Sequence, residues 1–251
     1  MSSFHEVQAF IDASKKAASA TELQSLVETI TNEMGFDYYA LVHHVDLTHR
    51  CSGKLVALSN YPESWIERYV EQNIVANDPV HLASHRTNVG FAWEEVSNLI
   101  KVTTAHRKIT AETRKAGIAD GYTVPANVPG EANGSCSFAM KFGKALPRTN
   151  IPMAQLVGSF AFQAARQMIV NAHGPDTLSP PIRLTPRQLE CVLLVGKGKS
   201  DWEIAKILGI KEDTVTEYLD DARQRYDVGK RIQLVMRAIF DGQIALSDVM
   251  N

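Results

Sequence analysis

Several aromatic side chains and one carboxylate carry polar groups at spacings that suit the capture of a small molecule. Trp65 and Tyr69 are four residues apart, so in a helix they project from the same face. The candidate binding residues are Tyr61, Trp65, Tyr69, Asp78, Trp93 and Ser137. Indole and hydroxyl donors around a single carboxylate acceptor, on otherwise apolar side chains, predict a hydrophobic pocket with a few fixed polar contacts.

Each of these residues also has a purely structural interpretation. Asp78 before Pro79 is the pattern of a helix N-cap followed by proline at the first helical position. Trp65 with Tyr69 is also typical of an aromatic stripe in a core, on which Trp93 packs from a strand. Both interpretations stay open at each position, and only the whole set favours a ligand pocket.

Catalytic and metal-binding functions are not supported by the sequence. The serines that flank Cys136 lack a GxSxG elbow, and no base for a nucleophile can be identified. His43, His44 and His49 cluster near a predicted hairpin, but adjacent strand residues point to opposite faces, so His43 and His44 are poorly placed to share an ion. We therefore expect that the protein is not an enzyme and that it binds neither a metal ion nor another cofactor.

A second functional pattern lies near the C-terminus, where a predicted helix contains a small residue and ends at a glycine. Ser200-Asp201-Trp202-Glu203 has the form of a capping box and begins a helix that Gly209 ends. Ala205 lets a second helix pass close by, Gly209 takes the left-handed turn, and Val215 packs between the two helices. The pattern predicts a helix-turn-helix that places its second helix in the DNA major groove, and a plain αα-hairpin is the alternative.

The predicted recognition helix, about residues 212–226, is acidic for a DNA reader. Thr216 and Asp220 occupy its exposed positions, where polar groups meet base edges. Residues 183–251 hold 11 Lys and Arg against 11 Asp and Glu. Favourable charge near the helix N-terminus accounts for the first-turn acids but not for Asp220. The residues expected at the DNA are Lys199, Ser200, Thr214, Thr216, Glu217, Asp220 and Arg223.

Hydrophobic periodicity predicts the elements that position these residues. Two amphipathic helices open the chain and end at Gly35. Further helices are expected at about 62–73, 79–86, 102–118 and 151–170, and strands at 38–44, 54–59, 90–93, 122–127 and 135–142. The first unit is therefore predicted to be an α/β sandwich with a central antiparallel sheet, and the second a small all-α domain of four helices that opens at the capping box Thr185-Pro186-Arg187-Gln188.

Composition and a stretch of helix-breaking residues divide the chain into two units. A stretch rich in proline over 173–183 separates residues 1–172 from residues 184–251. The chain has 251 residues, is 45% hydrophobic and carries a formal charge of −2, so it lacks the basic field common in nucleic-acid binders. It shows neither a signal peptide nor the ~20 apolar residues of a membrane span, which predicts a cytoplasmic protein. Its three cysteines lie far apart and are expected to be reduced.

The motifs of both units resemble one family of bacterial regulators. The C-terminal unit resembles the DNA-binding domain of the LuxR family through Leu184-Thr185-Pro186-Arg187, Gly198-Lys199-Ser200, Trp202-Glu203-Ile204-Ala205 and Thr214-Val215. The first unit resembles the autoinducer-binding domain of the quorum-sensing branch through Tyr61-Pro62, Trp65, Tyr69, Asp78-Pro79, Phe91-Ala92-Trp93, Gly121 and Ser137. Gln188 stands where the family usually has glutamate, and glutamine also closes a capping box.

This resemblance implies a small-molecule autoinducer of the N-acyl homoserine lactone type, double-stranded DNA and a second copy of the chain as partners. In the family, the residue matching Trp65 donates its indole N–H to the lactone carbonyl, and the residue matching Asp78 accepts the amide N–H of the ligand. The residues matching Tyr61 and Ser137 reach the amide carbonyl of the ligand. Those matching Tyr69 and Trp93 pack on its acyl chain and its ring. We therefore expect a homodimeric, ligand-responsive transcription regulator.

Three other functions remain to be compared with this one. A response regulator controlled by phosphorylation would need an acidic cluster and an opening strand, whereas this chain is predicted to open with a helix. An acyl-lactone hydrolase would need a catalytic constellation that the sequence lacks. The acidic recognition helix favours a different alternative, a signal-sequestering or protein-binding regulator with weak or lost DNA binding.

Overall fold

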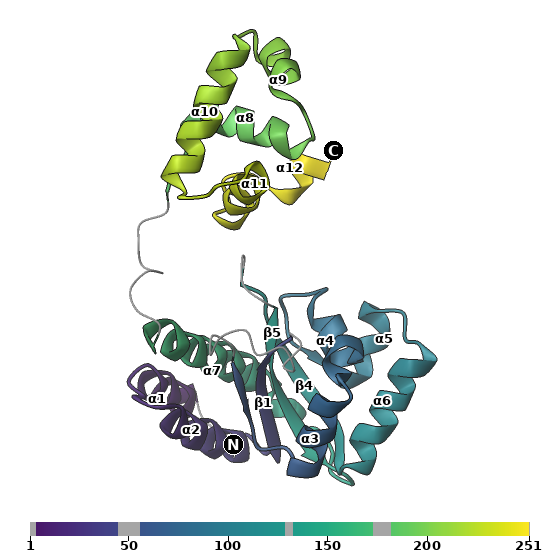
Figure 1. Ribbon diagram of the computed structural model, residues 1–251. Coiled ribbons are helices and arrows are strands. Elements are labelled where there is room, and N and C mark those ends of the chain that lie inside the picture. Colours follow the sequence, from purple (N-terminus) through teal and green to yellow (C-terminus); the bar gives the residue numbers. More distant parts are fainter. Residues whose placement is uncertain (1–3, 45–55, 129–132, 173–181, 251) are drawn as a thin grey trace. The chain divides into compact units, whose positions relative to one another are not determined.

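The computed structural model describes residues 4–44, 56–128, 133–172 and 182–250. The chain divides into two compact units, Met1–Thr177 and Leu178–Asn251 (Figure 1). Most of the proposed linker over 173–183, together with His49 and Cys51, lies outside the described residues.

A five-stranded antiparallel sheet forms the centre of the N-terminal unit, in the strand order β2-β1-β5-β4-β3. The strands β1 to β5 are Tyr38–His43, Ala57–Ser59, Phe91–Ala92, Ile118–Ala126 and Gly134–Lys141. Pairing between β4 and β5 places Thr123 directly opposite Ser137. The α/β sandwich expected from the sequence is confirmed.

One face of the sheet packs on α2 (Ala20–Glu33) and α7 (Ile151–Ala172), and α1 (Phe4–Ser14) packs on these two helices in the same core (Figure 1). Side chains of β5 alternate between the two faces, as the pleat requires. Cys136, Phe138 and Met140 join the core under α7, whereas Ala139 packs with Trp65 on the opposite side.

Short helical elements cover the other face: α3 (Glu63–Glu71), η1 (Ile74–Asn77), α4 (Pro79–Ser84), η2 (Trp93–Glu95), α5 (Val96–Leu99) and α6 (Thr104–Lys115) (Figure 1). The helix expected over 102–118 ends earlier, because Gly117 takes a φ of +89° and the fully buried Ile118 already begins β4. The strand expected over 90–93 is also shorter, because Trp93 begins the 3-10 turn η2.

The C-terminal unit is entirely helical within its described residues. Its helices are α8 (Pro186–Gly196), α9 (Asp201–Leu208), α10 (Glu212–Arg225), α11 (Arg231–Phe240) and a short α12 (Leu246–Met250) that the sequence did not predict. Capping boxes begin α8 and α9, and the backbone N–H of Thr185 donates to Gln188 Oε1, so glutamine closes the box as expected. Gly209 has a φ of +66° and Val215 is fully buried, as a helix-turn-helix requires.

Candidate functional site

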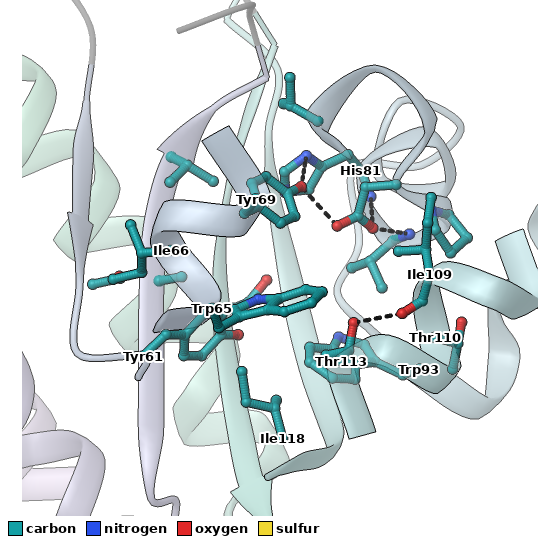
Figure 2. Close-up of a pocket in the computed structure, with 18 of the residues that line it drawn as sticks. Tyr61, Trp65, Ile66, Tyr69, His81, Trp93, Ile109, Thr110, Thr113 and Ile118 are labelled. Carbon is teal, nitrogen blue, oxygen red and sulfur yellow. Dashed lines mark hydrogen bonds between the residues drawn. The ribbon is translucent and has the colours of Figure 1, made fainter. Parts of the chain in front are cut away.

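A cavity of about 720 Å³ lies on the sheet face covered by the short helices (Figure 2). Apolar side chains such as Ile66, Val70, Ile109 and Ile118 form much of its lining. The structure brings all six candidate binding residues to this one cavity: Tyr61, Trp65, Tyr69, Asp78, Trp93 and Ser137. A volume of this size accommodates a small organic molecule.

Asp78 unites the two interpretations that the sequence left open. Its Oδ1 accepts hydrogen bonds from the backbone N–H groups of Val80 and His81, which caps α4. Its Oδ2 accepts a hydrogen bond of 2.7 Å from the Tyr69 hydroxyl inside the cavity (Figure 2). Burial and the nearby carboxylate raise the pKa of Tyr69 well above its usual value, so this hydroxyl keeps its proton.

Trp65 offers a donor to the cavity. Its side chain is buried on α3, one helical turn from Tyr69, and the two rings meet edge to face with centroids 5.8 Å apart. No group in the described part of the chain accepts a hydrogen bond from its indole N–H. Tyr61 lies beneath it, where burial raises the pKa of the phenol, so Tyr61 is a second neutral donor (Figure 2).

Trp93, Thr123 and Ser137 form a hydrogen-bonded row across three elements. The Trp93 indole N–H donates to Thr123 Oγ1 at 2.9 Å, and Thr123 Oγ1 is 2.8 Å from Ser137 Oγ. Trp93 therefore uses its donor within the protein and presents a ring to the cavity. Gly121 permits this arrangement, since a Cβ there would come within 2.6 Å of the Trp93 ring.

Two polar residues of this site were not among those predicted from the sequence. Thr123 is fully buried in β4, and His81 lines the cavity from α4, with Nδ1 3.2 Å from the Tyr69 hydroxyl oxygen (Figure 2). His81 follows Asp78 by three residues. In the helix predicted over 79–86, this spacing places His81 on the same side as Asp78, which is the signal that could have identified it. Burial lowers the pKa of His81 below its usual value, although Asp78 opposes the shift.

The structure places the two adjacent histidines of the predicted cluster in different surroundings, in keeping with their expected opposite directions. His43 and His44 contact different elements, since His43 meets the ring of Phe162 while His44 stacks on His81. Within the described ranges, no three His, Cys, Asp or Glu side chains are placed to hold a metal ion.

Most of the candidate DNA-contacting residues lie on or beside α10. Thr216, Glu217 and Asp220 are exposed on this helix, and Thr214 is half-buried. Lys199 and Ser200 precede α9, where both contact Glu203. Asp220 pairs with Arg223 one turn later, so its charge has a partner on the same helix.

Asp201 connects three helices of the C-terminal unit. Both of its carboxylate oxygens accept hydrogen bonds of 2.5 Å from the Arg231 guanidinium of α11. Its Oδ2 also accepts a hydrogen bond of 3.1 Å from the Thr216 hydroxyl of α10. Arg231, and then Thr216, lower the pKa of Asp201, so the carboxylate stays charged. The Thr216 hydroxyl, expected at the bases, is thus held by α9.

An α/β sandwich with an internal apolar cavity, followed by a helix-turn-helix, defines a regulator that couples a small ligand to DNA. Residues 19–165 match the autoinducer-binding domain, and residues 183–238 match the bacterial regulatory proteins of the luxR family. The chain belongs to the LuxR family of quorum-sensing transcription regulators. This family consists of regulators and not of enzymes, in agreement with the prediction.

Curated relatives match along almost the whole chain. The quorum sensing-dependent regulator RpaR of Rhodopseudomonas palustris is 29% identical over 243 residues, with 94% of each chain covered. The transcriptional activator VanR of Vibrio anguillarum is 26% identical over 242 residues, covering 96% of this chain and 98% of the relative.

Solved structures show the same fold. Escherichia coli SdiA aligns with a TM-score of 0.61 at 22% identity, covering 95% of this chain and 98% of that one. A second SdiA structure, in complex with octanoyl-rac-glycerol, has a TM-score of 0.60 at 21% identity, covering 96% of this chain and 97% of that one.

Among the described residues, the helices are too short or too polar to span a membrane.

Proposed function

We propose that the cavity binds an N-acyl homoserine lactone or a related acylated signal, and that the signal controls DNA binding by a homodimer. The observation that carries this proposal is the convergence of a donor, an acceptor and apolar walls in one cavity. Trp65 offers an indole N–H, Asp78 offers a carboxylate, and the lining is otherwise mainly hydrophobic. An acyl lactone needs these groups, because it has one amide N–H, two carbonyls and an apolar chain.

The contacts of each residue support a particular role. Asp78 Oδ1 is already used by two backbone N–H groups, so Oδ2 is the oxygen that accepts the amide N–H of the signal, beside the Tyr69 hydroxyl. Trp65 donates to the lactone carbonyl. Tyr61 and Ser137 face the amide carbonyl, and Tyr69 and Trp93 supply ring surfaces.

Ligand titration tests the proposed signal. The purified chain is titrated with an acyl homoserine lactone, its ring-opened form and octanoylglycerol. We expect tight binding of the intact lactone and weak binding of the ring-opened form, which has lost the ester carbonyl geometry that Trp65 addresses. Binding of octanoylglycerol without binding of any lactone would refute a lactone signal.

We propose that double-stranded DNA contacts α10 and the N-terminal end of α9. The residues involved are Lys199, Ser200, Thr214, Thr216, Glu217, Asp220 and Arg223. A homodimer presents two such helices, so the DNA site should have approximate two-fold symmetry with half-sites about one helical turn apart. We place this regulator in the cytoplasm, where it can reach DNA.

Gel-shift with selected and random DNA, with and without signal, tests the proposed DNA binding. Sedimentation tests whether the protein is a dimer. We expect signal-dependent affinity for a two-fold site. Absence of DNA binding at low salt with signal bound would instead favour a signal-sequestering regulator.

A further inference from the structure

His81 adds a hydrogen-bonding group to the cavity that the roles proposed above leave unused. Its side chain is 7% exposed and lines the cavity from α4. Its Nδ1 faces the Tyr69 hydroxyl (Figure 2). Within the described residues its other ring nitrogen, Nε2, has no hydrogen-bond partner, and this nitrogen is not sealed by the surrounding atoms.

The hydrogen bonds around Tyr69 determine which nitrogen of His81 carries the proton. The Tyr69 hydroxyl has one hydrogen, which it donates to Asp78 Oδ2. Its oxygen therefore accepts from His81, so the N–H of the imidazole is on Nδ1. Burial lowers the pKa of His81 below its usual value, which keeps the ring neutral at pH 7. A neutral imidazole with its proton on Nδ1 has a bare lone pair on Nε2.

A second histidine holds the His81 ring in place. His44, which follows β1, stacks on His81 with ring centroids 3.8 Å apart and 13° between the planes. His44 is itself fixed at both nitrogens, because Ser135 Oγ is 2.8 Å from its Nε2 and His85 Nε2 is 2.8 Å from its Nδ1. Turning the His81 ring over would break its bond to Tyr69, so the lone pair on Nε2 has a fixed direction.

We propose that His81 Nε2 accepts a hydrogen bond from a hydroxyl group on the acyl part of the signal, so that the cavity selects hydroxylated acyl chains. This inference rests on the proposed function, in which Asp78 accepts the amide N–H. Two hydrogen bonds connect Asp78 to His81 through Tyr69, so the hydroxyl lies within a few carbon atoms of the amide, as in a 3-hydroxyacyl chain.

Other chains meet the same nitrogen less well. A 3-oxo group would direct its lone pairs at the lone pair of Nε2, and an unsubstituted methylene would leave Nε2 without a partner. A bound hydroxyl donates one hydrogen and matches it. Selection therefore depends on the tautomer that Tyr69 and Asp78 impose.

Calorimetric titration of the full chain at pH 7.5 tests this selection with three lactones of equal chain length: 3-hydroxyoctanoyl, 3-oxooctanoyl and octanoyl. We expect the wild type to bind the 3-hydroxy form at least tenfold more tightly than the other two. His81→Leu should reduce this preference to within threefold and bind the octanoyl form at least as tightly as the wild type, which shows that its cavity is intact. His106→Leu is the matched control, because His106 is a buried histidine at the start of α6 that does not line the cavity, and it should keep the preference.

A second variant tests the tautomer without altering His81. Tyr69→Phe removes the acceptor that holds the proton on Nδ1, so the proton can move to Nε2 and donate to an oxo group. The 3-oxo form should then bind within threefold of the 3-hydroxy form. This variant also decides the matter if His81→Leu fails to fold.

The outcomes separate this inference from the proposed function. Equal affinity of the wild type for all three lactones would overturn selection by His81 and leave lactone binding intact. A preference that persists in both His81→Leu and Tyr69→Phe would also overturn it. Binding of none of the lactones by the wild type would refute the proposed function and this inference together.

Discussion

Replacement of Asp78 should separate its two structural contributions, because each oxygen has different partners. Asp78→Ala removes the N-cap of α4, which costs about 0.5 to 2 kcal/mol. It also leaves the buried Tyr69 hydroxyl without its charged acceptor, which costs about 1 to 3 kcal/mol. His81 Nδ1 can substitute as acceptor if its proton moves to Nε2, so we place this second cost near 1 kcal/mol.

A double-mutant cycle isolates the second contribution. Tyr69→Phe in the Asp78→Ala background removes a hydroxyl that has already lost its charged acceptor, so it should cost about 1 kcal/mol less than Tyr69→Phe in the wild type. The assay is urea unfolding of the ligand-free chain, followed by fluorescence, since two of the three tryptophans belong to the N-terminal unit.

A matched control uses another helix cap. Thr103→Ala removes the side-chain cap of α6 and has no contact with Tyr69, so its effect should add to that of Tyr69→Phe. If Asp78→Ala and Tyr69→Phe were additive within about 0.3 kcal/mol, the bond between the two side chains would contribute nothing to stability, and the assignment of Oδ2 would be wrong.

Three further predictions concern acid, the lactone donor and DNA. Burial lowers the pKa of His44 and of His81 in the folded chain, whereas in the unfolded chain each of them takes up a proton near pH 6.5. The unfolding free energy should therefore fall below pH 6.5, by up to about 1.4 kcal/mol per pH unit for each histidine. Urea unfolding from pH 7.5 to 5.5 measures the slope, and an unchanged slope in His44→Leu would contradict this origin. Trp65→Phe should weaken lactone binding by about 0.5 to 1.5 kcal/mol, because a buried carbonyl loses its donor; calorimetry showing wild-type affinity would mean that the signal lies in another orientation. Asp220→Asn should tighten binding to all DNA sequences, because it releases Arg223 from its ion pair, and should steepen the slope of log affinity against log salt concentration by about one. Gel-shifts over a salt series measure this slope. A loss of affinity confined to the selected site would indicate instead that Asp220 reads a base.

The elements fixed by neighbouring residues were predictable. The capping boxes at Thr185 and Ser200, the left-handed Gly209 and the apolar spacing around them depend on contacts within a few residues, so the helix-turn-helix followed from the sequence. The end of α6 was misplaced because apolar spacing continued through Ile118, and only the sheet shows that this residue pairs with Lys141 in β5.

The site was predictable as a set of residue types but not as a hydrogen-bond network. The row from Trp93 to Ser137 depends on strand register, which sets Thr123 opposite Ser137 across 14 residues of sequence. His81 was missed for a related reason. Proximity along the chain groups His44 with His43 and His49, whereas folding brings His44 against His81 of α4, 37 residues further on.

Alternation along β5 divides the evolutionary constraints on this strand. Its even positions, Cys136 and Phe138, are committed to the core beneath α7, where any change in volume is felt by the whole unit. Its odd positions belong to the opposite face, where Ser137 lines the cavity. Selection for a new signal can therefore act on every second residue of one strand while the alternate residues preserve the fold, so diversity of ligand and conservation of scaffold can coexist within eight consecutive residues.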